Sequence, residues 1–434
     1  MKPNKLLALV TIGATALTWA DVSVVDVKCT PRSPWNGLVD VSYTVACDDP
    51  NAEVYVNPVG YDGDRGITLF PSSFTGDGAT NTVKAGKHQM VWNALKDFGA
   101  FSCANFQMKM YAGKRLPRYV VIDLSSGSES TDYPVRFSFE GPDVTQDACR
   151  TTELWLRLVC PGSFYMGSPT YELGREDNED LHRVTFTQPF YMGVFEVTQK
   201  QWELVCGDRQ SYFKEAENSD VRPVENTNLG YIRGSSYPLK SDGLFDFSFM
   251  AKIRGRAHLV GIDLPSEARW EYACRAGTMT ALHNGKNLTD VQNSGTLVDI
   301  VGYYDNRYGN HSYSSSSVSV GTAKVGSFKP NALGLYDMLG NVSELCRDGY
   351  SSNEHLGFDE VCDPGVADAV RKDNLWFFWV RGGDWCSQAA KCRSARRWVN
   401  DCVYYGREKN PSSFYWNDHR WNTVGFRICC EVGF

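Results

Sequence analysis

Apolar and polar residues alternate along much of the first hundred positions of this chain. The segments 22–27 (VSVVDV) and 39–45 (VDVSYTV) place an apolar side chain at roughly every second residue, which is the period of a half-buried β-strand. Shorter runs of the same kind lie at 53–56, 88–92 and 106–111. Strands this close together, with Gly, Asp and Asn between them, predict a small β-sandwich over residues 21–112. We expect Trp35 and Trp92 in its core, because large aromatic side chains are usually buried.

The pattern changes after residue 112. The serine-rich run SSGSES at 125–130 indicates a linker or bridging segment over residues 113–154, with possible strands at 119–124 and 135–139. Beyond this segment Trp and Gly become frequent and the periodicity weakens. Helices are predicted at 265–275, which opens with Pro-Ser and ends before Ala-Gly, and at 198–206. The predicted fold class is therefore α+β: an N-terminal β-sandwich followed by an irregular, loop-rich domain over residues 155–434.

The N-terminus and the charge of the chain bear on its location and its partners. Lys2 and Lys5 precede an apolar run at 6–17 that ends in small residues up to Ala20, which is typical of a signal peptide over residues 1–20. We therefore expect a secreted, periplasmic or cell-surface protein in which disulfides can form. No other stretch approaches the roughly 20 apolar residues that a membrane span needs. The net charge of −7, without a cluster of basic residues, argues against a nucleic-acid partner.

Nine short phrases follow one another in the second part of the chain. They are PGSFYMGS (161–168), EVTQKQW (196–202), RPV (222–224), LPSEARWEYACRAG (264–277), VGSF (325–328), NALGLYDMLGNVSE (331–344), VRGGDW (380–385), CRSAR (392–396) and GFR (425–427). Together they resemble the formylglycine-generating-enzyme, or sulfatase-modifying-factor, family over about residues 155–432. The resemblance implies an irregular C-type-lectin-like fold, in which glycines allow backbone conformations closed to other residues.

The resemblance also implies a test for catalysis. Family enzymes oxidise a sulfatase cysteine to formylglycine with a copper ion held by two thiolates spaced CxxxxC, and soft thiolates suit Cu(I). Here the candidates are Cys386 and Cys392, spaced CxxxxxC. By its place before Ser394-Ala395, Cys392 matches instead a structural cysteine that some members pair with the equivalent of Cys274. The resemblance therefore predicts a Cys274–Cys392 disulfide and no catalytic pair. A copper pair of altered geometry, or a Cys386–Cys392 disulfide, is the alternative.

A structural calcium site is the second feature that the resemblance implies. By position, Asp337 and Glu344 would supply side-chain oxygens and Gly340 and Val342 backbone carbonyls, and Ca²⁺ prefers such hard oxygen ligands. The alternative interpretation is that Asp337 caps a turn while Glu344 forms an ion pair.

These features predict an exported, non-catalytic module that binds a protein or glycan ligand or serves a structural role. One alternative is the copper-dependent oxidase acting on sulfatase cysteines. Another is a ligand-display protein, because the stretch 398–421 is rich in Tyr, Trp, Asn, Ser and Arg, residues common on adaptable binding surfaces.

Overall fold

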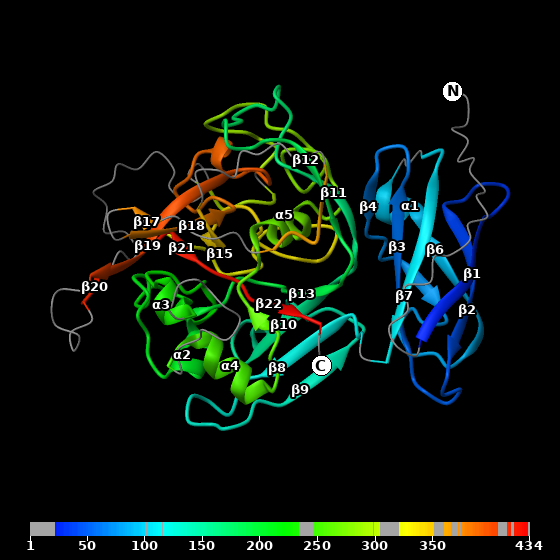
Figure 1. The fold of residues 1–434 in the computed structure, drawn as a ribbon, viewed down its shortest axis with the longest axis horizontal. Coiled ribbons are helices and arrows are strands. Elements are labelled where there is room, and N and C mark those ends of the chain that lie inside the picture. The colour runs from blue at the N-terminus through cyan, green and yellow to red at the C-terminus, as the bar shows by residue number, and fades with distance from the viewer. Residues whose placement is uncertain are drawn as a thin grey trace.

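The computed structural model describes residues 22–432, except residues 100–102, 115, 234–246, 298, 304–320, 351–359, 366–370, 373–374, 407–414 and 418–420. It has an α+β fold built mostly of strands (Figure 1). Residues 22–113, here called the N-terminal sandwich, lie beside a larger C-terminal domain that begins at residue 116. Among the described residues, no helix is both long and apolar enough to cross a membrane.

Two antiparallel sheets make up the N-terminal sandwich, as the alternating pattern predicts. The first has the order β1-β2-β6-β5 and the second the order β4-β3-β7. The strand bounds are β1 Val22–Pro31, β2 Leu38–Cys47, β3 Tyr55–Asp62, β4 Ile67–Leu69, β5 Phe74–Gly76, β6 Gly86–Asn93 and β7 Phe106–Gly113, and the short helix α1 spans Ala94–Phe98. Trp92 lies in the core between the sheets, stacked on Phe106. The same prediction was wrong for Trp35, which is 38% exposed because it lies in the exposed turn between β1 and β2.

The segment 113–154, predicted to be a linker or bridging segment with strands at 119–124 and 135–139, supplies two strands of the main sheet of the C-terminal domain. This six-stranded sheet has the order β14-β22-β13-β10-β8-β9. Its bounds are β8 Tyr119–Asp123, β9 Val135–Ser138, β10 Glu153–Val159, β13 Phe190–Gly193, β14 Ile262–Asp263 and β22 Cys429–Glu431. The serine-rich run is the loop between β8 and β9, which pair antiparallel. The C-terminal domain therefore starts well before residue 155.

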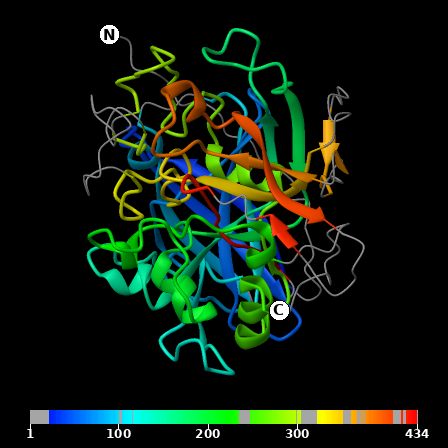
Figure 2. The same ribbon diagram turned by 90° about the vertical axis from the view of Figure 1, so that its left-hand side faces the viewer.

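Two further sheets complete this domain. One has the order β11-β12-β16, and the other the order β20-β19-β18-β15-β21 with β17 paired to β18. The bounds are β11 Gly162–Met166, β12 His182–Phe186, β15 Ser343–Gly349, β16 Glu360–Cys362, β17 Arg371–Lys372, β18 Leu375–Arg381, β19 Arg397–Gly406, β20 Tyr415–Asn417 and β21 Val424–Gly425. A long loop, residues 167–181, connects β11 to β12 (Figure 2).

The two predicted helices are present as α2 (Gln199–Cys206) and α5 (Glu267–Arg275), beside the additional helices α3 (Leu229–Ile232) and α4 (Phe249–Ala257). Thr198 and Gln201 form a capping box at the start of α2, which satisfies backbone N–H groups that a helix start leaves unpaired. Ser266 caps α5 by accepting a hydrogen bond from the backbone of Arg269. Helix α5 is almost wholly buried, and its side chains therefore lie at the centre of the domain, where they position the candidate site.

The three-stranded sheet of the sandwich has two buried faces. On β3, Val56 belongs to the sandwich core, whereas Val59, three residues on, belongs to the core of the C-terminal domain. An odd spacing on a strand places side chains on opposite faces, so the sheet is packed on both sides. At this junction the Ser163 backbone N–H donates to Thr68 Oγ1 at 2.9 Å. The sandwich and the C-terminal domain are therefore joined by a packed, hydrogen-bonded interface.

Candidate functional site

The segment that follows β18 holds the cysteine candidates against helix α5. Arg381, at the end of β18, is fully buried and pairs with Glu267 at 3.2 Å and with Glu271, both on α5. It also donates to the backbone carbonyls of Ser394 and Ala395. One guanidinium therefore fixes both the helix and the segment around residues 392–396, which carries Cys392.

Two glycines shape the turn that leads to the thiols. Gly382 and Gly383 both have positive φ, at 94° and 71°, a conformation that glycine adopts without the steric cost of a side chain. A Cβ on Gly383 would lie 2.9 Å from the Cys392 sulfur and 2.7 Å from the Lys391 carbonyl oxygen. The Cys392 thiol thus packs directly against the Gly383 backbone, and its side chain is fully buried.

Burial and the neighbouring Asp384 both act on the two candidate thiols. Cys386 directs its thiol and its backbone N–H to Asp384 Oδ1, at 3.1 and 3.0 Å. Burial and the Asp384 carboxylate raise the pKa of Cys386 far above its usual value. Burial, followed by the charges of Asp384 and Cys386, also raises the pKa of Cys392. Both groups are therefore held as neutral thiols, whereas the thiolate is the form that binds metal.

Cys274 lies on the same buried helix as the Arg381 partners. Its sulfur is 3.6 Å from the Ser394 hydroxyl, so α5 does lie against the segment that follows Cys392. Burial raises the pKa of Cys274 to about 12. In this structure Cys274, Cys386 and Cys392 are all free thiols, and the Cys274–Cys392 disulfide stays a prediction.

The loop proposed for calcium has the tight backbone that its sequence suggests. Asp337, Gly340 and Asn341 have φ values of 52°, 76° and 61°. Asp337 is buried, and its Oδ2 accepts a hydrogen bond from the Gly326 backbone. Its Oδ1 is buried and has no hydrogen-bond partner among the described residues. Such an orphaned carboxylate oxygen would suit a bound cation, since an unpaired buried polar atom is costly.

Glu344, the other predicted carboxylate ligand, is engaged by protein groups. Both of its oxygens accept bonds from the Arg427 guanidinium at 2.6 Å, and Trp270 donates to Oε2 at 2.7 Å. This ion pair is the alternative that the sequence left open. Among the described residues, the one group of three Asp, Glu, His or Cys side chains whose ligand atoms converge is Asp62, Asp64 and Cys103. Of the two predicted carboxylate ligands, only Asp337 has an oxygen without a hydrogen-bond partner among the described residues, and the calcium site stays a prediction.

Sequence inspection missed Glu196, a third carboxylate near this loop. It is fully buried and accepts hydrogen bonds from the Asn341 side chain at 2.6 Å and the Val342 backbone at 3.1 Å. Burial, then the charges of Asp337 and Glu344, raise the pKa of Glu196 well above its ordinary value. The available signal was a Glu between two apolar residues, Phe195 and Val197, where a charged side chain needs specific partners.

Most of the stretch 398–421, predicted as a display surface, lies outside the described side chains, which exclude residues 400–420. Trp421 is described and is 47% exposed. It lies next to the buried part of the domain, because its carbonyl oxygen accepts a hydrogen bond from the Asn226 backbone at 3.0 Å.

Comparison with known proteins places these features in a family. The model of the sulfatase-modifying factor enzyme 1-like domain matches residues 142–408. The chaperone protein LppX of Paenibacillus barcinonensis is 30% identical over 193 residues, which are 38% of this chain and 64% of that protein. The formylglycine-generating enzyme of Mus musculus is 26% identical over 240 residues, which are 47% of this chain and 60% of the enzyme.

Similarity to solved structures is low. PvdO from Pseudomonas aeruginosa is 22% identical, with a TM-score of 0.43 over 64% of this chain and 94% of that one. The chain spans less than two thirds of the length of LppX and of the mouse enzyme. The family model, however, covers more than half of the chain, and it does so where eight of the nine phrases lie. The chain therefore belongs to the sulfatase-modifying factor enzyme 1-like family.

Proposed function

We propose that this protein is an exported, non-catalytic member of its family that binds a protein or glycan partner or serves a structural role. The observation that carries the proposal is the hydrogen bond from the Cys386 thiol to the Asp384 carboxylate, beside a Cys392 thiol buried against the Gly383 backbone. A pair of thiolates for copper would have to form next to this carboxylate. Negative charge nearby and burial both disfavour the thiolate.

The relatives are compatible with either role. LppX is named as a chaperone, a protein that acts by binding a partner, whereas the mouse relative is named as an enzyme. The cysteine environment is what favours the binding role over the oxidase. The signal-peptide pattern at residues 1–20 supports export, and a disulfide or a structural calcium ion would fit that location.

The direct test is an assay for formylglycine formation. The full chain, loaded with Cu(I), is incubated in air with a sulfatase peptide that contains the target cysteine, and the mouse relative serves as the positive control. We expect no oxygen consumption and no change in peptide mass. Conversion of the peptide that disappears in Cys386→Ser would overturn the proposal and restore the oxidase.

Cu(I) affinity provides a second readout that does not depend on choosing the right peptide. Competition with a chromophoric chelator should give the same result for the wild type, Cys386→Ser and Cys392→Ser, because neither thiol is poised as a ligand. Non-reducing peptide mapping of the same preparation tests the predicted disulfide. A linked Cys274–Cys392 peptide would remove one candidate ligand outright, because a disulfide sulfur cannot act as a thiolate.

A further inference from the structure

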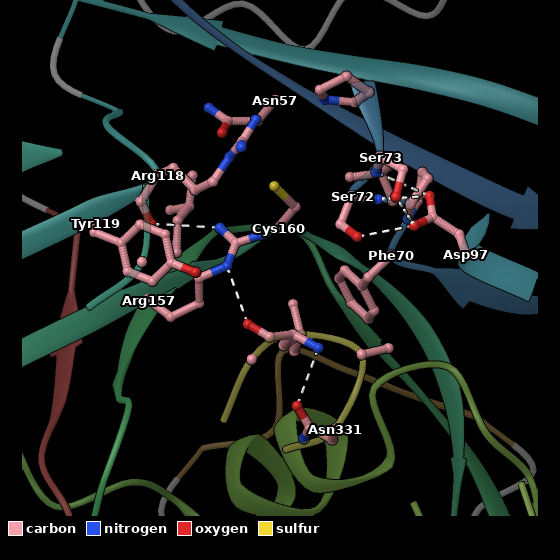
Figure 3. Close-up of a pocket in the computed structure, with 18 of the residues that line it drawn as sticks. Asn57, Phe70, Ser72, Ser73, Asp97, Arg118, Tyr119, Arg157, Cys160 and Asn331 are labelled. Atoms are coloured by element: carbon pink, nitrogen blue, oxygen red, sulfur yellow. Dashed lines mark hydrogen bonds between the residues drawn. The ribbon is translucent and has the colours of Figure 1, made fainter. Parts of the chain in front are cut away.

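A cavity of about 560 Å³ lies at the junction between the N-terminal sandwich and the C-terminal domain. The sandwich lines it with residues from β3, from the loop around Phe70 and from α1, and the C-terminal domain with residues from β8, β10 and the loop 331–334. Figure 3 shows two arginines, Arg118 and Arg157, among these residues, close to Cys160. This volume is within the range of sites that hold metabolite-sized molecules.

Neither arginine has a carboxylate partner among the described residues. Arg118 donates from Nη2 to the Ala79 carbonyl at 3.1 Å. Arg157 donates to the carbonyls of Leu333 and Arg118, at 3.2 and 3.3 Å, and lies over the Tyr119 ring (Figure 3). The hydrogen bonds of both side chains therefore end on neutral acceptors, and N–H groups of both guanidinium groups remain uncommitted.

The two cavity arginines are half-buried, and their arrangement differs from that of three fully buried arginines in the domain. Arg381, Arg393 and Arg427 are fully buried, and each is paired with at least one glutamate. Such pairing is the usual condition for placing a charge away from water. Among the described residues, the two cavity arginines thus have no carboxylate within ion-pair distance.

The two positive charges also disfavour each other. Burial, followed by the charge of Arg157, lowers the pKa of Arg118 to about 10. Lys96 also lines the cavity, together with the acidic residues Asp97 and Glu140. Asp97 is committed to Ser72, Ser73 and the Trp92 indole, and Glu140 is exposed. An anion between the arginines would relieve the repulsion.

We propose that this cavity is a binding site for a small oxyanion, the carboxylate or phosphate group of a metabolite-sized ligand, held by Arg118 and Arg157. Guanidinium groups recognise these anions well, because their planar N–H groups match two oxygen acceptors at once. The site is separate from the segment that carries Cys386 and Cys392. The proposal therefore goes beyond the binding role proposed above. Since both the sandwich and the C-terminal domain line it, an occupant contacts both and should stabilise their association.

The test is binding of inorganic phosphate and of succinate to the full chain, with sodium chloride at equal ionic strength as the reference. We expect either anion to raise the melting temperature in a saturable manner that chloride does not reproduce. Calorimetric titration then gives the affinity, and a preference between the two anions identifies the ligand group. No shift beyond that of chloride, with either anion, would overturn the proposal.

Variants locate the site. Arg118→Gln and Arg157→Gln should each weaken binding by about tenfold or more, since charge-assisted hydrogen bonds are lost. Arg118→Lys keeps the charge and should retain part of the affinity, which separates a binding effect from misfolding. Arg136→Gln is the matched control: Arg136 also lies over an aromatic ring, Trp155, but is paired with Glu153 outside the cavity. Wild-type affinity in both cavity Gln variants would contradict the assignment.

Discussion

At the scale of single residues, the backbone of the Asp337 loop depends on one glycine. Gly340 has a φ of 76°, and an added Cβ would collide with the Gly302 carbonyl oxygen and with Val301. Gly334 has the same φ of 76°, but the nearest atom to an added Cβ is the Tyr119 hydroxyl at 3.6 Å. The two positions therefore have the same positive φ, but only Gly334 has room for an added Cβ.

Alanine substitutions at Gly340 and Gly334 give a prediction with a matched control. Gly340→Ala should destabilise the protein by more than about 3 kcal/mol, because backbone strain and a clash with backbone atoms add. Gly334→Ala should cost about 1 kcal/mol, the strain of a positive φ alone. Urea unfolding of the three proteins checks this. Equal losses in the two variants would mean that the loop around Gly340 can shift.

A buried carboxyl group predicts how stability depends on pH. Burial raises the pKa of Glu225 to about 7, although the backbone N–H groups of Phe213 and Tyr212 donate to it. The folded protein therefore binds this proton more tightly than the unfolded chain does. The resulting stability is fully present below about pH 4.5 and is lost as the pH rises through about 7.

Glu225→Gln should remove this loss. Between pH 5 and 8 the free energy of unfolding of the wild type should fall by up to about 3 kcal/mol more than that of the variant, since one pKa unit corresponds to about 1.4 kcal/mol. The measurement is the free energy of unfolding in urea at several pH values. Glu203→Gln is the control, because the pKa of Glu203 is lowered, mainly by Arg209, and should not change the slope in this range.

At the scale of elements, helix α5 is held by charge as well as by packing. Glu267 and Glu271 lie on its buried face, and Arg381 reaches both from the end of β18. Arg397 pairs with Glu267 from the start of β19. Helix α5 is therefore tied at one point, away from water, to two strands that lie far from it in the sequence.

Arg381→Met tests how much the ion pairs of Arg381 contribute to the stability of the protein. The change leaves buried carboxylates short of a partner and should cost about 3–5 kcal/mol. Arg32→Met removes an exposed pair with Asp40 and should cost less than about 1 kcal/mol. Thermal unfolding of both variants provides the comparison. If the two losses were similar, the packing of α5 would be the main source of its stability.

The elements also show what the sequence could predict. Strands of the sandwich and the helices α2 and α5 have local signals: alternation, a capping residue and a terminal glycine. The pairing of β8 with β10 across more than thirty residues has no local signal, and the run SSGSES between β8 and β9 resembles a linker. The same limit applies to the site. The motifs contain Asp337, Asp384 and Arg427, but the contacts of Asp384 with Cys386 and of Arg427 with Glu344 depend on the fold.

At the scale of the whole molecule, the sandwich and the C-terminal domain share one hydrophobic core at their junction. Phe70 and Tyr111 of the sandwich belong to the same buried cluster as Tyr272 on α5. The rings of Phe70 and Tyr272 meet edge to face with centroids 5.6 Å apart, an arrangement that adds to the effect of burial. Figure 1 shows the sandwich standing beside the domain along this face.

Removal of the aromatic contact should uncouple the two parts. We expect the wild type to unfold in a single calorimetric transition, because loss of either part exposes the shared core. Phe70→Ala should cost about 3–5 kcal/mol and split this transition into two. Phe74→Ala is the control, since Phe74 is buried inside the sandwich against Trp92, away from the junction. It should lower the melting temperature while the transition stays single, because the contact between Phe70 and Tyr272 is intact. Two transitions in the wild type would show that the junction is too weak to couple the parts.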